Sequence, residues 1–374
     1  MNKLPTATMI IGTMCGTSMN SFDIVTVEFK DNVPIIHSTG VYKLPDDYKN
    51  KYLKIINVKG HSTLQELGEL NTWTGIVFAE AINKFIIENN LNKKNIAAIA
   101  NHGQTIWHSP NTKWPFTLQL GDSNVIAEKT GIITVGDFRN ADIAAGGQGA
   151  PLAPVFHKAV FASRKEARCI VNIGGFSNIS ILEYNKYLGF DTGPGNCLID
   201  QWTSEHFNKA YDESGAIAKT GKVIPELLAV LLKDPYFSQT APKSTGREYF
   251  NSAWLQRNLD TFSTKNYRTE DVLITLVHLT AYTIANAIKT YADPSAKIYI
   301  YGGGAHNNTL LEELSILLGK EVQTTNVLGI DPDWVEPVLF AWLARQRIIE
   351  QPINLMEITG SSHPVILGAL YKPN

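Results

Sequence analysis

Cysteine is scarce in this sequence and occurs only at three widely spaced positions, Cys15, Cys169 and Cys197. An odd number of cysteines without a CxxC pair encodes neither a disulfide framework nor a zinc site. The first residues, with one Lys, Pro5 and several Thr, also lack the run of roughly 7 to 15 apolar residues that forms the core of a signal peptide. These absences predict a reducing, cytoplasmic location.

Charge and long apolar runs are also limited. Charged residues make up 18% of the 374 residues, and 33 Lys plus Arg nearly balance 35 Asp plus Glu, for a net charge of −2. This composition excludes a disordered chain and favours neither a nucleic-acid nor a membrane partner. The most apolar stretch, residues 272–292, is interrupted by His278, Asn286 and Lys289. We expect the basic stretches 49–54 and 93–94 to be solvated faces.

Three catalytic signatures are missing. No Gly-Lys-Ser/Thr occurs, which excludes a Walker A loop, and no GxSxG occurs, which disfavours serine-dependent acyl transfer. His102 and His108 lack a metal-ligand spacing, so His102 is expected to be a hydrogen-bonded residue at a strand end, and any metal ligands stay undetermined.

What the sequence does contain is an α/β pattern that occurs twice. The first half begins with three predicted strands and continues with a helix at 64–87; the strands are residues 8–14, 23–29 and 35–42. The pattern restarts at residue 167 with strands at 169–173, 179–183 and 187–190. Each half begins with a hairpin whose turn is rich in Gly, Ser, Thr and Asn. We expect two similar domains with a ligand cleft between them.

The two hairpin turns are candidate phosphate loops. Residues 12–21 (GTMCGTSMNS) and 174–178 (GGFSN) offer small residues whose N–H groups can approach a phosphate, and Thr17 and Ser18 add hydroxyl donors. Taken alone, such a Gly/Ser/Thr hairpin is more often an ordinary turn than a phosphate loop. Two such turns facing one cleft favour a nucleotide held between domains.

A third candidate is the turn at residues 190–196 (FDTGPGN), where a strand ends at Asp191 and leads into a helix. Asp191 is placed to act as a base, and the helix N-terminus after Gly195 suits an anion. The alternative is that Asp191 only caps backbone N–H groups of the turn.

Two further segments carry polar or small residues after a strand. Gly302, Gly303 and Gly304 could let the backbone lie flat against a planar group such as adenine, or could serve packing alone. Arg139 could make a forked contact with a substrate carboxylate, or a structural pair with Asp142 or Asp137.

With these residues in hand, the sequence resembles the anhydro-N-acetylmuramic acid kinases of the sugar kinase, Hsp70 and actin ATPase superfamily. The similarity runs nearly end to end and includes 137–157 (DFRNADIAAGGQGAPLAPVFH), 172–180 (NIGGFSNIS), 189–196 (GFDTGPGN) and 244–250 (STGREYF). It implies two RNase H-like domains flanking a nucleotide- and sugar-binding cleft. We place them at 1–138 and 139–361, with about residues 362–374 as a candidate to pack back on the first.

The resemblance also implies a site. Asp191 would be the catalytic base. ATP, with Mg²⁺, would be bound by the loop residues Gly16, Thr17, Ser18, Met19, Asn20, Ser21, Phe22, Asp23, Gly174, Gly175, Gly302, Gly303 and Gly304. The sugar would be bound by His102, Gln104, Thr105, Asp137, Arg139 and Glu336.

The implied activity is ATP-dependent opening of 1,6-anhydro-N-acetylmuramic acid to N-acetylmuramic acid 6-phosphate in peptidoglycan recycling. Whether the protein forms a homodimer is not determined by the sequence. The first loop departs from the family pattern Gly-Thr-Ser-x-Asp-Gly, because Asn20 and Ser21 replace its Asp and Gly, while Asp23 is retained. Asn cannot supply the same charge to Mg²⁺ or its waters. Two alternatives therefore stay open, a kinase of another amino sugar and a non-catalytic, regulatory nucleotide-binding protein of the same fold.

Overall fold

The structure is a computed structural model that describes residues 8–16, 19, 21–57, 62–184, 186–241, 243–247, 249–262 and 267–374, without the side chains of 56 and 57. Three predicted cofactor-binding residues, Thr17, Ser18 and Asn20, lie outside the described residues.

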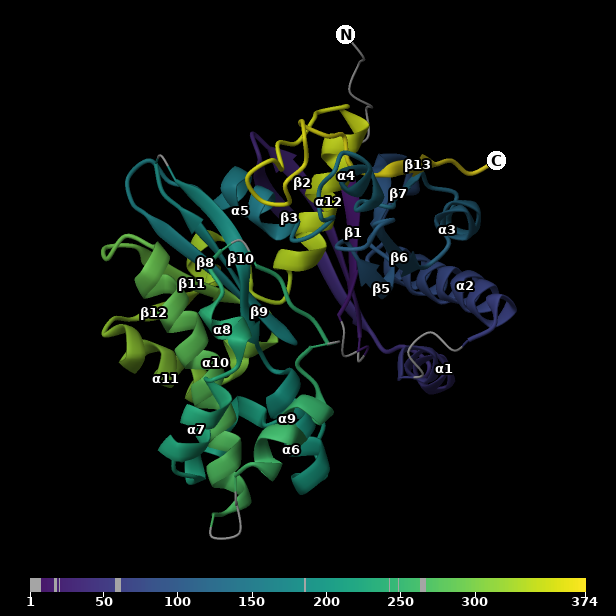
Figure 1. The fold of residues 1–374 in the computed structure, drawn as a ribbon. Helices are drawn as coiled ribbons and strands as arrows, with labels where there is room; N and C mark the ends of the chain where they lie inside the picture. The colour runs from purple at the N-terminus through teal and green to yellow at the C-terminus, as the bar shows by residue number, and fades with distance from the viewer. Residues whose placement is uncertain are drawn as a thin grey trace. The chain divides into compact units, whose positions relative to one another are not determined.

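The chain divides into two compact units. Unit 1 comprises Met1–Val160 and Trp334–Asn374, and unit 2 comprises Phe161–Asp333. The sequence boundary of 138/139 thus differs from the observed division, which also returns the chain to unit 1 at Trp334 instead of near residue 362. Each unit contains a mixed sheet with helices (Figure 1).

The sheet of unit 1 has the strand order β13-β7-β4-β1-β2-β3. β1, β2 and β3 are antiparallel neighbours, and β4 and β7 run parallel to β1. The final strand pairs antiparallel with β7. The bounds are β1 (Met9–Cys15), β2 (Phe22–Lys30), β3 (Val33–Tyr42), β4 (Ile96–Asn101), β7 (Thr134–Gly136) and β13 (Ala369–Tyr371); a separate ribbon consists of β5 (Gln104–Ser109) and β6 (Phe116–Leu120).

Helices of unit 1 pack on this sheet and on one another. α12 (Val335–Ile348) packs against β1, β2 and β4, although about 300 residues separate it from β1 in sequence. A Cβ at Gly12 would lie 2.0 Å from the carbonyl oxygen of Pro337, so only glycine allows this approach. The other helices are α1 (Asp46–Asn57), α2 (Leu64–Glu88), η1 (Lys93–Asn95), α3 (Ser123–Thr130), α4 (Asn140–Ala144) and α5 (Ala153–Phe161).

The sheet of unit 2 repeats the strand order of unit 1. β8, β9 and β10 are antiparallel neighbours, and β11 and β12 run parallel to β8, in the order β10-β9-β8-β11-β12. The same order in unit 1, β3-β2-β1-β4-β7, confirms the predicted duplicated α/β architecture of RNase H-like type. The bounds are β8 (Arg168–Ile173), β9 (Phe176–Leu182), β10 (Tyr187–Pro194), β11 (Lys297–Tyr301) and β12 (Val322–Thr324).

α10 (Thr269–Tyr291) is the central helix of unit 2 and packs against β9, β10, α6, α7 and α11 (Figure 1). By length and composition it could cross a membrane, but 78% of its most apolar stretch is buried, as in a core helix. The other helices are α6 (Cys197–Phe207), η2 (Glu213–Gly215), η3 (Ala218–Thr220), α7 (Pro225–Leu231), α8 (Pro235–Ser238), α9 (Ser252–Asp260), η4 (Gly303–His306), α11 (Asn308–Leu318) and η5 (Thr325–Leu328).

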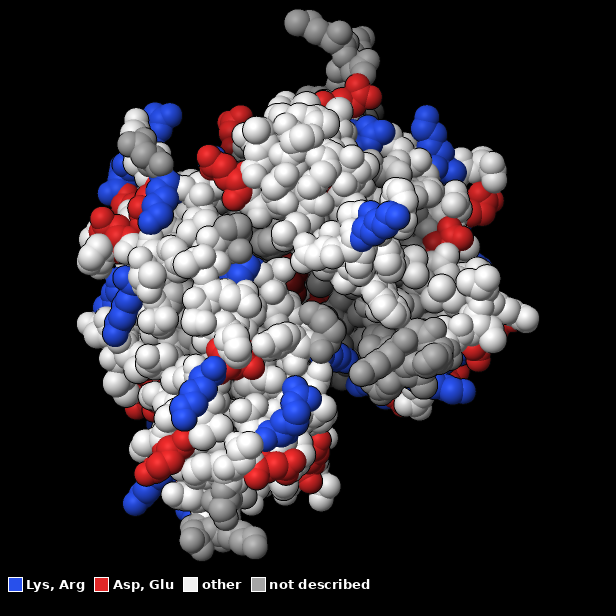
Figure 2. Space-filling model, in the orientation of Figure 1, with Lys and Arg blue, Asp and Glu red and all other residues white. Residues whose placement is uncertain are grey.

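The sequence analysis did not identify α1. Its basic stretch was expected to be only a solvated face, yet Tyr48, Tyr52 and Ile55 on the same helix are buried in the core of unit 1. Spacings of four and three residues place the three side chains on one face, and the lysines occupy the other positions. Charged residues of both signs are interspersed over the surface seen in Figure 2.

Candidate active site

Asp191 lies near the end of β10, and hydrogen bonds from outside the strand hold both its backbone and its carboxylate. Its N–H donates to the carbonyl of Lys243 (3.0 Å), and the Tyr236 hydroxyl donates to its carbonyl (2.8 Å). The N–H of Thr245 donates to Oδ2 at 3.0 Å. The β9–β10 register shifts between Asp191 and Gly193, and such a bulge re-aims a side chain. The carboxylate is therefore held in a defined orientation by a segment 54 residues away.

The start of α6 contacts the second hairpin turn directly. The N–H groups of Gly195 and Cys197 donate to the carbonyl of Gly175 (2.9 and 3.1 Å), and that of Asn196 donates to the carbonyl of Gly174 (2.8 Å). The expectation that this helix N-terminus is open to an anion is wrong for these three N–H groups, because carbonyls already occupy them. Their actual effect is to tie the turn after Asp191 to the Gly174–Gly175 turn.

The loop after β11 is shaped by two of its three glycines. Gly302 has φ 80°, and a Cβ there would lie 2.5 Å from Oδ1 of Asn172. A Cβ at Gly304 would lie 2.4 Å from the side chain of Ile173, so this glycine serves packing. Gly303 is exposed and has only Asn196 nearby, so its backbone is the part of the loop that a ligand can reach. The packing role is therefore confirmed for Gly302 and Gly304, and contact with a planar group stays a prediction that only the exposed Gly303 leaves room for.

The first hairpin turn is described only in part. Gly16 and Ser21 are half-buried, and the N–H of Met19 donates to the carbonyl of Gly16 at 3.0 Å. The side chains of Met19 and Phe22 are each 1% exposed in the core of unit 1, and Phe22 stacks on Phe78 at 4.0 Å. These two residues can therefore offer a cofactor only their backbone.

Asp23 follows this turn on β2. It pairs with Met14 of β1 and is half-buried. Its charge adds to the effect of burial, and together they raise the pKa of the neighbouring Cys15 thiol. The acid retained in the first loop thus lies beside a thiol that stays protonated.

Arg139 and His102 make direct contact. Nε and Nη2 of Arg139 lie 3.1 and 3.0 Å from Nε2 of His102, and Nη1 donates to the carbonyl of Gly149 at 2.8 Å. The His102 ring packs on Phe340 of α12, with centroids 4.4 Å apart. Burial, followed by the Arg139 charge, holds the pKa of His102 well below its usual range, so the imidazole is neutral. The expected strand-end histidine is thus also a partner of the predicted substrate-binding arginine.

The remaining predicted sugar-binding residues also belong to unit 1. Gln104 is buried at the start of β5, and its Oε1 has no hydrogen-bond partner among the described residues. Thr105 accepts from Gln119 (3.2 Å). Asp137 is exposed, has φ 54° and accepts from Asn140 (2.7 Å). Glu336 lies half-buried in the first turn of α12.

The structure brings predicted site residues together in two groups, one in each unit. In unit 1, Arg139 contacts His102, and His102 packs on Phe340 of α12. In unit 2, the turn after Asp191 touches Gly174 and Gly175, and Asn172 lies against Gly302. In the described part of the chain, no three His, Cys, Asp or Glu side chains gather as metal ligands would. Asp142 was considered in the sequence only as a structural partner of Arg139, and Gly149 and Thr359 were not predicted as site residues.

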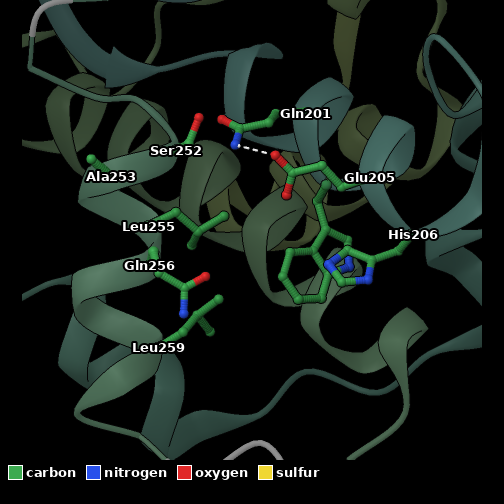
Figure 3. Close-up of a pocket in the computed structure, with 9 residues that line it drawn as sticks. Gln201, Glu205, His206, Ser252, Ala253, Leu255, Gln256 and Leu259 are labelled. Atoms are coloured by element: carbon green, nitrogen blue, oxygen red, sulfur yellow. Dashed lines mark hydrogen bonds between the residues drawn. The ribbon is translucent and has the colours of Figure 1, made fainter.

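A surface pocket of about 340 Å³ lies between α6 and α9 (Figure 3). Gln201 donates to Glu205 at 2.8 Å, and the rings of Trp202 and His206 are in tilted contact with centroids 3.8 Å apart. None of the sequence-predicted site residues lines this pocket, whose lining is Gln201, Trp202, Glu205, His206, Ser252, Ala253, Leu255, Gln256 and Leu259.

Comparison with known proteins identifies the family. The family model described as anhydro-N-acetylmuramic acid kinase matches residues 8–373. Anhydro-N-acetylmuramic acid kinases of Pasteurella multocida and Haemophilus influenzae are 46% and 45% identical to this chain; the alignments cover 96% of this chain in both cases, and 96% and 97% of the relatives. That of Shewanella oneidensis is 45% identical, covering 97% of this chain and 98% of the relative. The chain therefore belongs to the anhydro-N-acetylmuramic acid kinase family and is a kinase.

Proposed function

We propose that this kinase uses ATP and water to open 1,6-anhydro-N-acetylmuramic acid and to phosphorylate O6, giving N-acetylmuramic acid 6-phosphate for peptidoglycan recycling. Full-length similarity to named kinases of this sugar supports the substrate. The observation that carries the chemistry is the fixed carboxylate of Asp191, held through Thr245 at the end of β10.

Asp191 is the base in this proposal. It takes a proton from water while the water oxygen bonds to the anomeric carbon C1. The C1–O6 bond of the anhydro bridge breaks, and O6 bonds to the γ-phosphorus as ADP leaves. One carboxylate suffices where a glycosidase generally needs two, because phosphoryl transfer replaces protonation of the leaving oxygen. Sugar, ATP and water thus become sugar 6-phosphate, ADP and a proton.

The nucleotide is assigned to the glycine loops. We assign the phosphates to residues 16–23 and to Gly174 and Gly175, and the adenosine to the loop around the exposed Gly303. Met19 and Phe22 contribute backbone only, since their side chains are buried.

Mg²⁺ belongs to the same proposal. It is expected to be held largely by phosphates and water. The buried Oδ1 of Asn172 has no hydrogen-bond partner among the described residues and suits a metal-bound water. Asp23 is the retained acid of the first loop. The ion would neutralise phosphate charge.

The sugar is assigned to His102, Gln104, Thr105, Asp137, Arg139 and Glu336. Support comes from the buried Oε1 of Gln104, which has no hydrogen-bond partner among the described residues, and from the Arg139–His102 contact, both in unit 1. The fork of Arg139 is turned partly toward His102 and Gly149, so a forked grip on a substrate carboxylate is not its main contact.

Isotope labelling tests the reaction. Incubation with Mg·ATP and the anhydro sugar in ¹⁸O-water should give the 6-phosphate with label at C1 and none in the phosphate, measured by mass spectrometry. Label in free phosphate would indicate ATP hydrolysis alone. ATP binding without any product would favour the non-catalytic alternative, and product from another amino sugar only would favour the other kinase.

Replacement of the base tests its role. Asp191→Asn keeps the size of the side chain but cannot take the proton, so kcat should fall about 10²- to 10⁴-fold. Sugar and ATP affinities, measured by calorimetry, should stay near those of the unmodified chain. A near-normal kcat would remove Asp191 from the base role.

Location and assembly complete the proposal. We assign the protein to the cytoplasm, with no nucleic-acid or membrane partner and with a homodimer as one possible assembly. All three cysteines are free thiols, and burial raises the pKa of Cys169 and of Cys197 to about 12, so both stay protonated. Unpaired thiols suit a reducing compartment.

A further inference from the structure

Asp142 is a fully buried carboxylate that serves two different segments of unit 1. Oδ2 accepts from the N–H of Gly149 at 2.6 Å, and Oδ1 accepts from the hydroxyl of Thr359 at 2.7 Å. Burial is the main influence on its pKa and raises it. A buried carboxyl group is costly, so its two hydrogen bonds are the features that explain its presence there.

The Gly149 peptide connects Asp142 to Arg139. Its N–H donates to Asp142, and its carbonyl accepts from Nη1 of Arg139 at 2.8 Å. Gly149 has φ 72°, which favours glycine. A Cβ at Gly147 would lie 2.3 Å from Oδ2, so the loop closes tightly over the carboxylate. Asp142 therefore determines where the Gly149 carbonyl can meet Arg139.

Arg139 in turn determines the tautomer of His102. A guanidinium only donates, so Nε2 of His102 must accept from it and carries no proton. The neutral ring then has its proton on Nδ1. His102 is 7% exposed, and the backbone of the adjacent Gly103 is close enough to its ring to raise the pKa, yet no described residue meets Nδ1 with full hydrogen-bond geometry. A buried donor of this kind requires an acceptor.

We propose that Asp142 is a positioning residue for sugar binding: through the Gly149 peptide it holds Arg139, and Arg139 holds His102 as the tautomer that donates from Nδ1 to an acceptor oxygen of the sugar. This rests on the proposed function, because it takes His102 and Arg139 as part of the sugar site. It makes His102 a donor and excludes it as a base in this state.

The two oxygens of Asp142 allow a matched pair of variants. Asp142→Asn keeps the shape but turns one acceptor into a donor. It should raise the KM for the sugar about tenfold, the size expected when a hydrogen bond to a charged group is lost, and leave the KM for ATP within about twofold. Thr359→Val removes only the other contact. It should lower the melting temperature and leave the KM for the sugar unchanged, while Thr359→Ser should restore stability.

A spectroscopic readout does not depend on turnover. In ¹⁵N-histidine-labelled protein, His102, assigned by loss of its signals in His102→Gln, should show a protonated Nδ1 and an unprotonated Nε2. Asp142→Asn should weaken this signature, Thr359→Val should keep it, and Arg139→Lys, which lacks the fork, should lose it. Arg139→Lys also tests the chain of contacts if Asp142→Asn does not fold.

Three results would overturn the inference. The first is a proton on Nε2 of His102 in the unmodified chain, and the second is an Asp142→Asn variant with an unchanged His102 signature and an unchanged KM for the sugar. The third is a rise in the sugar KM in Thr359→Val as large as that in Asp142→Asn, which would make the role of Asp142 structural. Failure of the proposed function looks different. The unmodified chain would then form no product, while the His102 signature and calorimetric sugar binding would still decide the role of Asp142.

Discussion

Single residues show how burial alone changes the chemistry of a side chain. Burial lowers the pKa of His157 to about 3 and raises that of Asp200 to about 7, and neither residue is in the proposed mechanism. A shifted pKa therefore does not by itself mark a catalytic residue in this protein. The hydrogen-bonded contacts that run from Asp142 to His102 are the more specific indication of a site.

His157 should make stability depend on pH. Its folded pKa is lowered, so between about pH 6.5 and 3 the unfolded chain binds a proton that the folded chain refuses, and stability is lost as pH falls. The difference in unfolding free energy between the unmodified chain and His157→Gln should shrink by about 2 kcal/mol from pH 7 to pH 5. Urea titrations at both pH values measure this. A pH-independent difference would contradict it.

Asp200 should give the stability a pH dependence of the opposite sign. Its folded pKa is raised, so below about pH 7 the folded chain holds a proton that the unfolded chain releases down to about pH 4. The stability of the unmodified chain relative to Asp200→Asn should therefore decline as pH rises from 5 to 8. The same urea titrations check it, and a rise in that range would show that burial does not control Asp200.

At the scale of elements, the packing of a helix on a strand depends on how closely the two backbones can approach each other. α12 packs on β1 only because Gly12 leaves room for the carbonyl of Pro337 and for Ala341. This contact also positions the first turn of α12, which carries Glu336, relative to β1. The glycines near the loops after β10 and β11 act in the same way, as the contact of Gly302 with Asn172 shows.

Two glycine substitutions should differ in sign. Gly12→Ala places a Cβ 2.0 Å from the Pro337 oxygen and should destabilise the protein by about 1 to 3 kcal/mol. Gly68→Ala, on an exposed turn of α2 with nothing within 4 Å, should stabilise by about 0.5 to 1 kcal/mol. Chemical unfolding at pH 7 measures both. Equal effects would mean that the α12–β1 contact is adjustable.

At the scale of the whole molecule, the two units differ in continuity although their sheets share a strand order. Unit 2 is one uninterrupted segment, Phe161–Asp333, whereas unit 1 needs Trp334–Asn374 in addition to Met1–Val160. The later segment supplies α12 and β13, which pack on β1 and pair with β7. Unit 1 is therefore complete only after the chain has passed through unit 2.

Fragments should reflect this difference. Residues 161–333 alone should show a cooperative thermal transition by circular dichroism, because their sheet and the core around α10 are contained in one segment. Residues 1–160 alone should not, since β1 lacks α12. Joining 334–374 to 1–160 by a flexible linker is the control that should restore a transition. A cooperative transition of 1–160 alone would contradict this account.

Much of the fold could be predicted from the sequence because strand and helix patterns are local. The predicted helix at 64–87 corresponds to α2, Leu64–Glu88, and the hairpin at the start of each half is present. α1 was missed because the lysines between its apolar residues obscure the short apolar face in the sequence pattern. The expectation of free N–H groups at the start of α6 was wrong for residues 195–197, because the carbonyls of Gly174 and Gly175, about 20 residues away in sequence, accept from them.

The sequence by itself determined the α/β class, the duplication, the kinase family and Asp191 as the candidate base, since these depend on local periodicity and on motifs contiguous in the chain. Only the tertiary structure decided that Arg139 meets His102, that Asp142 lies under Gly149 and that α12 returns to unit 1. The physical reason is distance along the chain: 217 residues separate Asp142 from Thr359, and packing alone brings such partners into hydrogen-bond range.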